Sequence, residues 1–192
     1  MKDKILKLLN DSINTKSKLI SDNTFILNVE QAVNFCFETI INGNTIFFCG
    51  NGGSAADAQH IAAELTGKFK NDRKPLKGIV LGSNFSSLTA IGNDYSFDEV
   101  FSRELNGLGK KGDLLIAYTT SGNSKNVIKA LEVSKKLNIN SILMVGKNGH
   151  DAANFADIVI SIPSGVTARI QEAHITVSHI IFEIFEEKFL NA

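Results

Sequence analysis

The sequence predicts an α/β protein with a doubly wound, five-stranded parallel sheet and a helical extension at its N-terminus. Two features support this prediction. Short apolar runs rich in β-branched residues alternate with segments of helical periodicity, which is typical of a parallel sheet covered by helices on both faces. Loops rich in glycine and hydroxyl residues follow two of these runs, as expected where ligands bind at the carboxyl ends of parallel strands. The five expected strands are residues 45–48, 78–81, 114–118, 142–145 and 158–162.

The length and composition of the chain fit one domain over residues 1–192. The 20 lysines and arginines balance 20 aspartates and glutamates, so the charge favours neither nucleic acid nor an anionic membrane. No apolar run approaches the roughly 18 residues that span a bilayer. Charges interrupt residues 1–11, so we expect no signal peptide. Cys36 and Cys49 lie in apolar surroundings, which favours reduced core residues and a cytoplasmic protein.

The first 42 residues carry two apolar stripes with helical spacing, over residues 5–20 and 25–40. Gly43 is suited to end the second helix. The first stripe has no apolar partner nearby in the sequence. Two interpretations are open: this helix packs on another subunit of an oligomer, or it folds back on its own domain.

The remaining elements follow the same alternation of strand and helix. Pro163 is expected to end the fifth strand, because proline cannot donate to the sheet. Residues 67–77 read as a polar, basic loop. Helices are expected at residues 86–91, 97–105 and 126–137, and a long last helix from Thr167 towards Phe189.

Residues 49–54, Cys-Gly-Asn-Gly-Gly-Ser, follow the first strand and precede an alanine-rich helix. A strand, a tight glycine turn and an open helix N-terminus form a site for an anion such as a phosphate. We expect Ser54 to be the N-cap and Asp57 to favour the first turn. The fit to the dinucleotide pattern G-x-G-x-x-G/A is weak, because residues 81–84 lack the acidic residue that the pattern needs. The nucleotide motif G-x-x-x-x-G-K-[ST] is absent.

A second loop, Thr-Thr-Ser-Gly-Asn-Ser at residues 119–124, follows the third strand. Its hydroxyl and backbone N–H groups suit a phosphate monoester that is held without lysine or arginine. The alternative is an ordinary capping loop, since serine and threonine favour caps for local reasons. Both loops should open on the same edge of the sheet, which favours the binding interpretation.

Four further polar residues are candidates for chemistry. His60 and Glu64 stand at i and i+4 and share one face of their helix, while Gln171 and His179 face roughly one way on the last helix. The first two are alternatively a solvated pair on a helix surface. His179 is alternatively a packed core or interface residue. His174 points away from His179 and is assigned a structural role.

Five segments of the chain, taken together, carry a family resemblance. They are Cys-Gly-Asn-Gly-Gly-Ser at 49–54, Asp-Ala-Gln-His-Ile-Ala-Ala-Glu-Leu-Thr-Gly at 57–67, Ile-Gly-Asn-Asp-Tyr at 91–95, Thr-Ser-Gly-Asn-Ser at 120–124, and Thr-Ala-Arg-Ile-Gln-Glu-Ala-His at 167–174 with His179 beyond it. These segments resemble the phosphoheptose isomerase family, over nearly the whole chain and in the same order; the N-terminal helices match least distinctively. The resemblance implies the SIS (sugar isomerase) fold, which is flavodoxin-like. It also implies conversion of D-sedoheptulose 7-phosphate into D-glycero-D-manno-heptose 7-phosphate through an enediol(ate), the first step of bacterial heptose biosynthesis.

By the same resemblance Glu64 is the catalytic base and His179 its acid partner. The resemblance also implies one Zn²⁺ per subunit, held by His60, Glu64, Gln171 and His179, of which the glutamine oxygen is an unusual ligand. A side chain bound to a metal carries protons poorly, so the metal either frees a ligand during turnover or organises the site and polarises the carbonyl. The implied substrate contacts are Asn51, Gly52, Gly53, Ser54, Glu64, Asn93, Asp94, Thr119, Thr120, Ser121, Ser124 and Gln171.

Family members are homotetramers with sites between subunits, which would give the first apolar stripe a partner. One departure from the family is Thr119, where serine is frequent; the hydroxyl is kept and a methyl group is added. Asp94 is alternatively a turn residue after Gly92 and Asn93.

Two other functions are open: a non-catalytic SIS protein that binds or senses a sugar phosphate, and an aldose–ketose isomerase for another sugar phosphate. The heptose could enter lipopolysaccharide, capsule or another glycan.

Overall fold

The computed structural model describes residues 1–147 and 150–192 and contains one five-stranded sheet with the strand order β2-β1-β3-β4-β5. Every neighbouring pair is parallel, so the predicted doubly wound sheet is confirmed. The order reverses between β1 and β3, and the loops after these two strands therefore flank a crevice at the carboxyl edge of the sheet. The strands are β1 (Ile46–Gly50), β2 (Gly78–Val80), β3 (Leu114–Thr119), β4 (Asn140–Gly146) and β5 (Ile158–Ile162).

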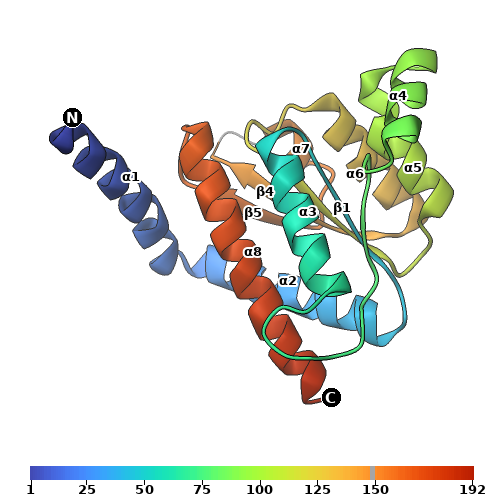
Figure 1. Cartoon of the computed structure of the whole chain (residues 1–192), viewed down its shortest axis with the longest axis horizontal. Coiled ribbons are helices and arrows are strands. Elements are labelled where there is room, and N and C mark those ends of the chain that lie inside the picture. The colour runs from blue at the N-terminus through green and yellow to red at the C-terminus, as the bar shows by residue number, and fades with distance from the viewer. Residues whose placement is uncertain (148–149) are drawn as a thin grey trace.

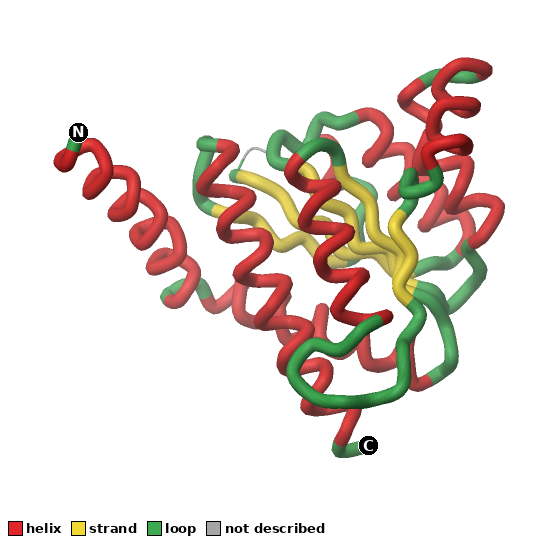
Figure 2. Tube along the Cα trace, viewed as in Figure 1, coloured by secondary structure: helices red, strands yellow, loops and turns green. Residues whose placement is uncertain are grey.

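Helices cover both faces of the sheet (Figure 2). The predicted helix at residues 97–105 consists of a short 3-10 turn followed by α5, and the short helix α7 was not predicted. The other predicted helices are present with end points shifted by a few residues. The elements are α1 (Lys2–Ile20), α2 (Asn23–Ile41), α3 (Gly53–Thr66), α4 (Phe85–Asp94), η1 (Phe97–Glu99), α5 (Val100–Leu108), α6 (Lys125–Leu137), α7 (His150–Ala153) and α8 (Thr167–Leu190).

Two hydrophobic cores lie on opposite faces of the sheet, because successive side chains of a strand point to opposite sides. Phe48 packs into the core beneath α2, α3 and α8, while its neighbour Phe47 packs into the core beneath α5 and α6. Each fully buried side chain of this size contributes about 1.5–3 kcal/mol. Cys36 and Cys49 are free and buried in different cores, as expected for reduced core residues.

The N-terminal helix α1 extends away from the rest of the molecule (Figure 1). Of its residues only Thr15 and Leu19 are buried, and Ile5, Leu9 and Ile13 are each more than half exposed. Its attachment to the body includes a hydrogen bond from Arg169 Nη1 to the carbonyl oxygen of Leu8 (3.0 Å). Most of the apolar stripe is therefore uncovered within one chain.

Within residues 1–147 and 150–192, none of the helices combines the length and the apolar content needed to span a bilayer.

Candidate active site

A cavity of about 310 Å³ opens where the chain leaves β1 and β3. The two loops that the sequence singled out form its walls, and the N-terminal part of α8 also lines it. The order of strands explains this position, since β1 and β3 are neighbours whose following segments pass to opposite faces of the sheet. The cavity is lined by Asn51, Gly52, Gly53, Ser54, Tyr118, Thr119, Thr120, Ser124, Thr167 and Gln171.

The start of α3 differs from the prediction. Gly52, with φ of +57°, is the N-cap, and no side chain caps the helix. Ser54 is therefore the second residue of the helix rather than its cap, and Asp57 lies beyond the first turn. A glycine in the left-handed region turns the chain before the serine is reached, which explains both errors. The uncapped N-terminus leaves its positive end available to an anion in the cavity.

Gly53 allows the N-terminal ends of α3 and α8 to meet. A Cβ atom at this position would lie 2.5 Å from Nε2 of Gln171, closer than a real contact permits. The amide of Gln171 can therefore lie against the backbone of the glycine loop, on the wall of the cavity. The glycine is required here by the close approach of the side chain, independently of the backbone angles.

Hydrogen bonds within the loop at residues 119–124 fix its shape. The hydroxyl of Thr119 lies 3.2 Å from Oγ of Ser124 and accepts the backbone N–H of Gly122 (3.2 Å), which has φ of +74°. Ser121 Oγ accepts the N–H of Asn123 (3.2 Å) and lines an adjoining cavity of about 220 Å³. The hydroxyl groups of this loop therefore both hydrogen-bond its own backbone and line the cavities.

The side chains of His60, Glu64 and His179 lie together between α3 and α8. One nitrogen or oxygen of each lies within 4.8 Å of the other two. The two imidazole rings meet edge to face with their centroids 5.0 Å apart, and His60 Nε2 lies 3.4 Å from Glu64 Oε1. The helices run side by side in Figures 1 and 2, which brings together residues that are more than a hundred positions apart.

The surroundings of His179 favour its neutral form. Burial lowers the pKa of His179, the nearby His60 lowers it further, and Glu64 opposes the shift. A neutral imidazole has a free nitrogen lone pair that can accept a proton or bind a metal ion. Two imidazoles and one carboxylate that converge at a partly exposed position form a donor set suited to Zn²⁺.

Comparison with known proteins places this arrangement in a family. The SIS domain family matches residues 10–146. The chain is 51% identical to the phosphoheptose isomerase of Aliarcobacter butzleri over 83% of this chain and 85% of that protein. It is 43% identical to that of Clostridium acetobutylicum over 98% of this chain and 96% of the relative. The structure of phosphoheptose isomerase GmhA from Neisseria gonorrhoeae superposes with a TM-score of 0.90 at 36% identity, covering 97% and 98% of the two chains.

The chain belongs to the phosphoheptose isomerase family.

Two residues implied by resemblance to phosphoheptose isomerases lie apart from this cavity. Asn93 and Asp94 are the last residues of α4 rather than a turn, and both are exposed. Nδ2 of Asn93 donates to Oδ1 of Asp94 (2.9 Å). Neither lines the cavity of its own chain. The structure thus brings the two loops and Gln171 to one cavity, places the His/Glu/His group on the helices α3 and α8, and leaves Asn93 and Asp94 elsewhere.

Sequence reasoning missed three residues at this site. Tyr118 and Thr167 line the cavity. Asn126 is almost fully buried and exchanges two hydrogen bonds with the side chain of Asn51, each 2.9 Å long. A polar residue in the first turn of α6, next to apolar Val127, was the only signal for Asn126, and such a residue is indistinguishable in sequence from an exposed one.

His174 has the structural role that the sequence assigned to it. Its side chain is fully buried, with its ring centroid 6.0 Å from that of Tyr118. Burial lowers the pKa of His174 to about 4, so it is neutral at neutral pH. The hydroxyl of Tyr118 in turn lies 3.0 Å from Oγ of Ser178, which completes a buried polar layer under the site.

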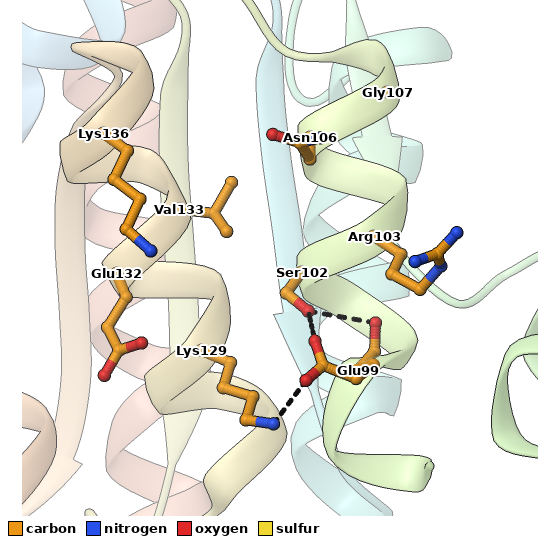
Figure 3. A pocket seen from close by; sticks show the side chains of 9 residues that line it. All are labelled: Glu99, Ser102, Arg103, Asn106, Gly107, Lys129, Glu132, Val133 and Lys136. Atoms are coloured by element: carbon orange, nitrogen blue, oxygen red, sulfur yellow. Dashed lines mark hydrogen bonds and ion pairs between the residues drawn. The ribbon is translucent and has the colours of Figure 1, made fainter. Parts of the chain in front are cut away.

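A larger cavity of about 480 Å³ lies on the opposite face, between α5 and α6 (Figure 3). Glu99 and Lys129 form an ion pair there, and the other oxygen of Glu99 accepts the hydroxyl of Ser102 (2.6 Å). No group of metal-ligating residues lies there among the described parts of the chain. Among the described residues, this groove therefore has no counterpart of the His/Glu/His group between α3 and α8.

Proposed function

We propose that this chain is an aldose–ketose isomerase that converts D-sedoheptulose 7-phosphate into D-glycero-D-manno-heptose 7-phosphate. One observation carries the proposal: the cavity at the start of α3 and the His/Glu/His group lie at successive levels of the same helix pair. The step from Gly53 to His60 corresponds to about 10 Å along α3. A heptose phosphate carries its phosphate and its carbonyl at opposite ends of the carbon chain, so one molecule can reach both.

The phosphate would bind at the carboxyl edge of β1 and β3. Backbone N–H groups of Gly52 and Gly53 and the positive end of α3 supply attraction without a full charge. The hydroxyls of Ser54, Thr120, Ser121 and Ser124 would add hydrogen bonds, with Asn51 and Thr119 shaping the loops. Gln171 lies at the cavity wall and would contact the sugar.

The chemical step needs a base and a proton carrier on the two sides of the reacting carbons. Glu64 would remove the proton from the carbon next to the carbonyl and return it to the neighbouring carbon, through an enediol(ate). His179, kept neutral by burial and by His60, would move a proton between the two oxygens. A Zn²⁺ held by His60, Glu64, Gln171 and His179 would polarise the carbonyl oxygen when bound, and Glu64 and His179 would carry protons only while released from it.

The proposal includes assembly into a homotetramer in the cytoplasm. The support is the uncovered apolar stripe of α1, in which the side chains of Ile5, Leu9 and Ile13 are each more than half exposed. Asn93 and Asp94 would reach substrate only in such an assembly, because they lie outside the cavity of their own chain. The product would enter the synthesis of bacterial surface heptose in lipopolysaccharide, capsule or another glycan.

A sugar-phosphate sensor with the same fold is the alternative. A sensor needs the cavity and the two loops, but it has no use for a carboxylate and two imidazoles within 4.8 Å of one another. The presence of this group favours the enzyme.

The decisive experiment incubates the zinc-supplied protein with sedoheptulose 7-phosphate and follows the appearance of an aldoheptose phosphate by NMR. Glu64→Gln is the matched variant, since it keeps the size of the side chain and removes the base. We expect product with the wild type and none with the variant, while both bind the sugar phosphate. Binding without turnover by the wild type would instead identify a sensor, and comparable turnover by the variant would remove Glu64 as the base.

A further inference from the structure

The loop at residues 67–77 joins α3 to β2 and is anchored to α8 by one buried carboxylate. Glu186, of which 2% of the side chain is exposed, accepts the backbone N–H groups of Lys70 and Asn71, both at 3.0 Å. It also accepts Nδ2 of Asn71 (3.1 Å) and Nε of Arg73 (2.9 Å). Four donors converge on this carboxylate, so it organises the loop around a single point.

The guanidinium of Arg73 connects this point to the end of α3. Only 3% of its side chain is exposed. Nη2 donates to the carbonyl oxygen of Glu64 (2.6 Å), and Nη1 donates to that of Leu65 (3.0 Å). The last carbonyl groups of a helix have no partners within the helix, so Arg73 caps α3 at the residue that carries the proposed base.

The same loop also reaches the proposed acid. Phe69, one residue before Lys70, places its ring centroid 5.6 Å from that of His179, which lies two turns before Glu186 on α8. The loop held by Glu186 therefore contacts the backbone carbonyl of Glu64 through the side chain of Arg73, and it contacts the ring of His179 through the ring of Phe69. Both ends of the proposed acid–base pair depend on one anchoring point.

Stability alone is a weak explanation for this arrangement. A buried ion pair gains little net stability, because the cost of removing two charges from water offsets their attraction. Burial raises the pKa of Glu186, but its hydrogen bonds to Lys70, Asn71 and Arg73 outweigh this and lower the pKa below its ordinary value. The planar guanidinium has the fixed geometry needed to hold a carboxylate and two carbonyl groups at once.

We propose that Arg73 and Glu186 are positioning residues that set the placement of Glu64 and His179 relative to each other. They contact no part of the cavity that would hold the phosphate. The proposal rests on the proposed isomerase function, and it predicts that their loss affects turnover more than substrate binding. A displacement of catalytic groups by a fraction of an ångström to about 1 Å is sufficient to slow a reaction by about 10-fold to 100-fold.

The test compares Glu186→Gln and Arg73→Lys with the wild type and with Glu183→Gln. Glu183 is a matched control, because it lies on the same helix and pairs with Lys70 of the same loop, but at the surface. We expect kcat for sedoheptulose 7-phosphate to fall at least about 10-fold in the first two variants, with KM within about twofold. Glu183→Gln should change neither constant by more than about twofold.

A second readout does not depend on activity. The ring of Phe69 lies close enough to His179 that its ring current should shift the Cε1–H signal of His179 in the NMR spectrum of histidine-labelled protein. The chain has 4 histidines to assign. We expect this signal to move in Glu186→Gln and to stay in place in Glu183→Gln. If the wild type proves inactive, the proposed function fails. The movement of this signal still reports whether Arg73 and Glu186 position His179.

Thermal unfolding establishes that each variant is folded before it is compared. If Glu186→Gln does not fold, Arg73→Lys decides the matter, because it keeps the buried charge pair and removes only the planar fork. A kcat within about twofold of the wild type in a folded variant, an unmoved His179 signal, or an equal loss in Glu183→Gln would each overturn the proposal.

Discussion

The side chains of Asn51 and Asn126 exchange two hydrogen bonds of 2.9 Å and so join the loop after β1 to the helix that follows β3. Asn126 is 3% exposed, and its Oδ1 also accepts the backbone N–H of Val127 (3.0 Å). An amide has two N–H groups and two acceptor positions, so Asn51 keeps one of each for a substrate. The pair therefore orients Asn51 and holds the two halves of the cavity at a fixed separation.

Replacing Asn126 with alanine should weaken substrate binding. Each lost hydrogen bond costs about 0.5–1.5 kcal/mol, so we expect KM for the sugar phosphate to rise about 10-fold, with a smaller change in kcat. The combined Asn51→Ala and Asn126→Ala variant should lose less than the sum of the two single losses, since both changes break the same pair. Asn106→Ala, at an exposed asparagine on the other face, is the control. Additive losses would show that the pair does not act as a unit.

Replacing Gly53 with alanine should damage both stability and binding. The new Cβ would lie 2.5 Å from Nε2 of Gln171, so the two helix ends must separate or the amide must leave the cavity wall. We expect a loss of about 1–3 kcal/mol in the free energy of unfolding, measured in urea, and a higher KM. Gly107→Ala is the matched control, because a Cβ there meets nothing within 4 Å and alanine favours the helix. A Gly53→Ala protein as stable as the wild type would contradict the close contact.

Removal and return of zinc should change the thermal stability of the protein. A metal that binds only the folded state raises the unfolding midpoint, and the rise grows with the logarithm of the ratio of metal concentration to its Kd. We expect the midpoint to fall after chelation and to recover with added Zn²⁺, and both responses to be lost in His60→Ala. Glu183→Gln, whose carboxylate lies outside the His/Glu/His group, should respond like the wild type. Identical midpoints with and without zinc would count against a metal at this group.

Acid should destabilise the protein partly through His174. Burial lowers the pKa of His174 in the folded state to about 4, whereas the unfolded value is near 6.5. The unfolded chain therefore binds the proton first, and the contribution that is complete above pH 6.5 is lost as the pH falls towards 4. We expect the wild type to lose about 2 kcal/mol more than His174→Gln between about pH 7 and about pH 5, measured by urea unfolding. Parallel losses in the two proteins would show that His174 is not the group that titrates.

Much of the sheet was predictable from residue type alone. The range predicted for β5, residues 158–162, matches the structure, and the expected limits of the other strands differ by a few residues at most. Buried parallel strands read as continuous apolar runs, which makes them visible in a sequence. The start of α3 was wrong by contrast, because the conformation of Gly52 and not the capping preference of Ser54 decided it.

The order of the strands and of the helices other than α7, the two glycine and hydroxyl loops, and the family could all be inferred from the chain, because they depend on residue types and on spacings within single segments. The folded molecule was needed to bring His60 and Glu64 to His179, to join Asn51 to Asn126 across 75 positions, and to place Arg73 on Glu186 across 113. Whether a polar side chain is buried depends on a partner that lies on another element. The separation of the two partners along the chain follows no periodic pattern, so it cannot be read from residue spacing.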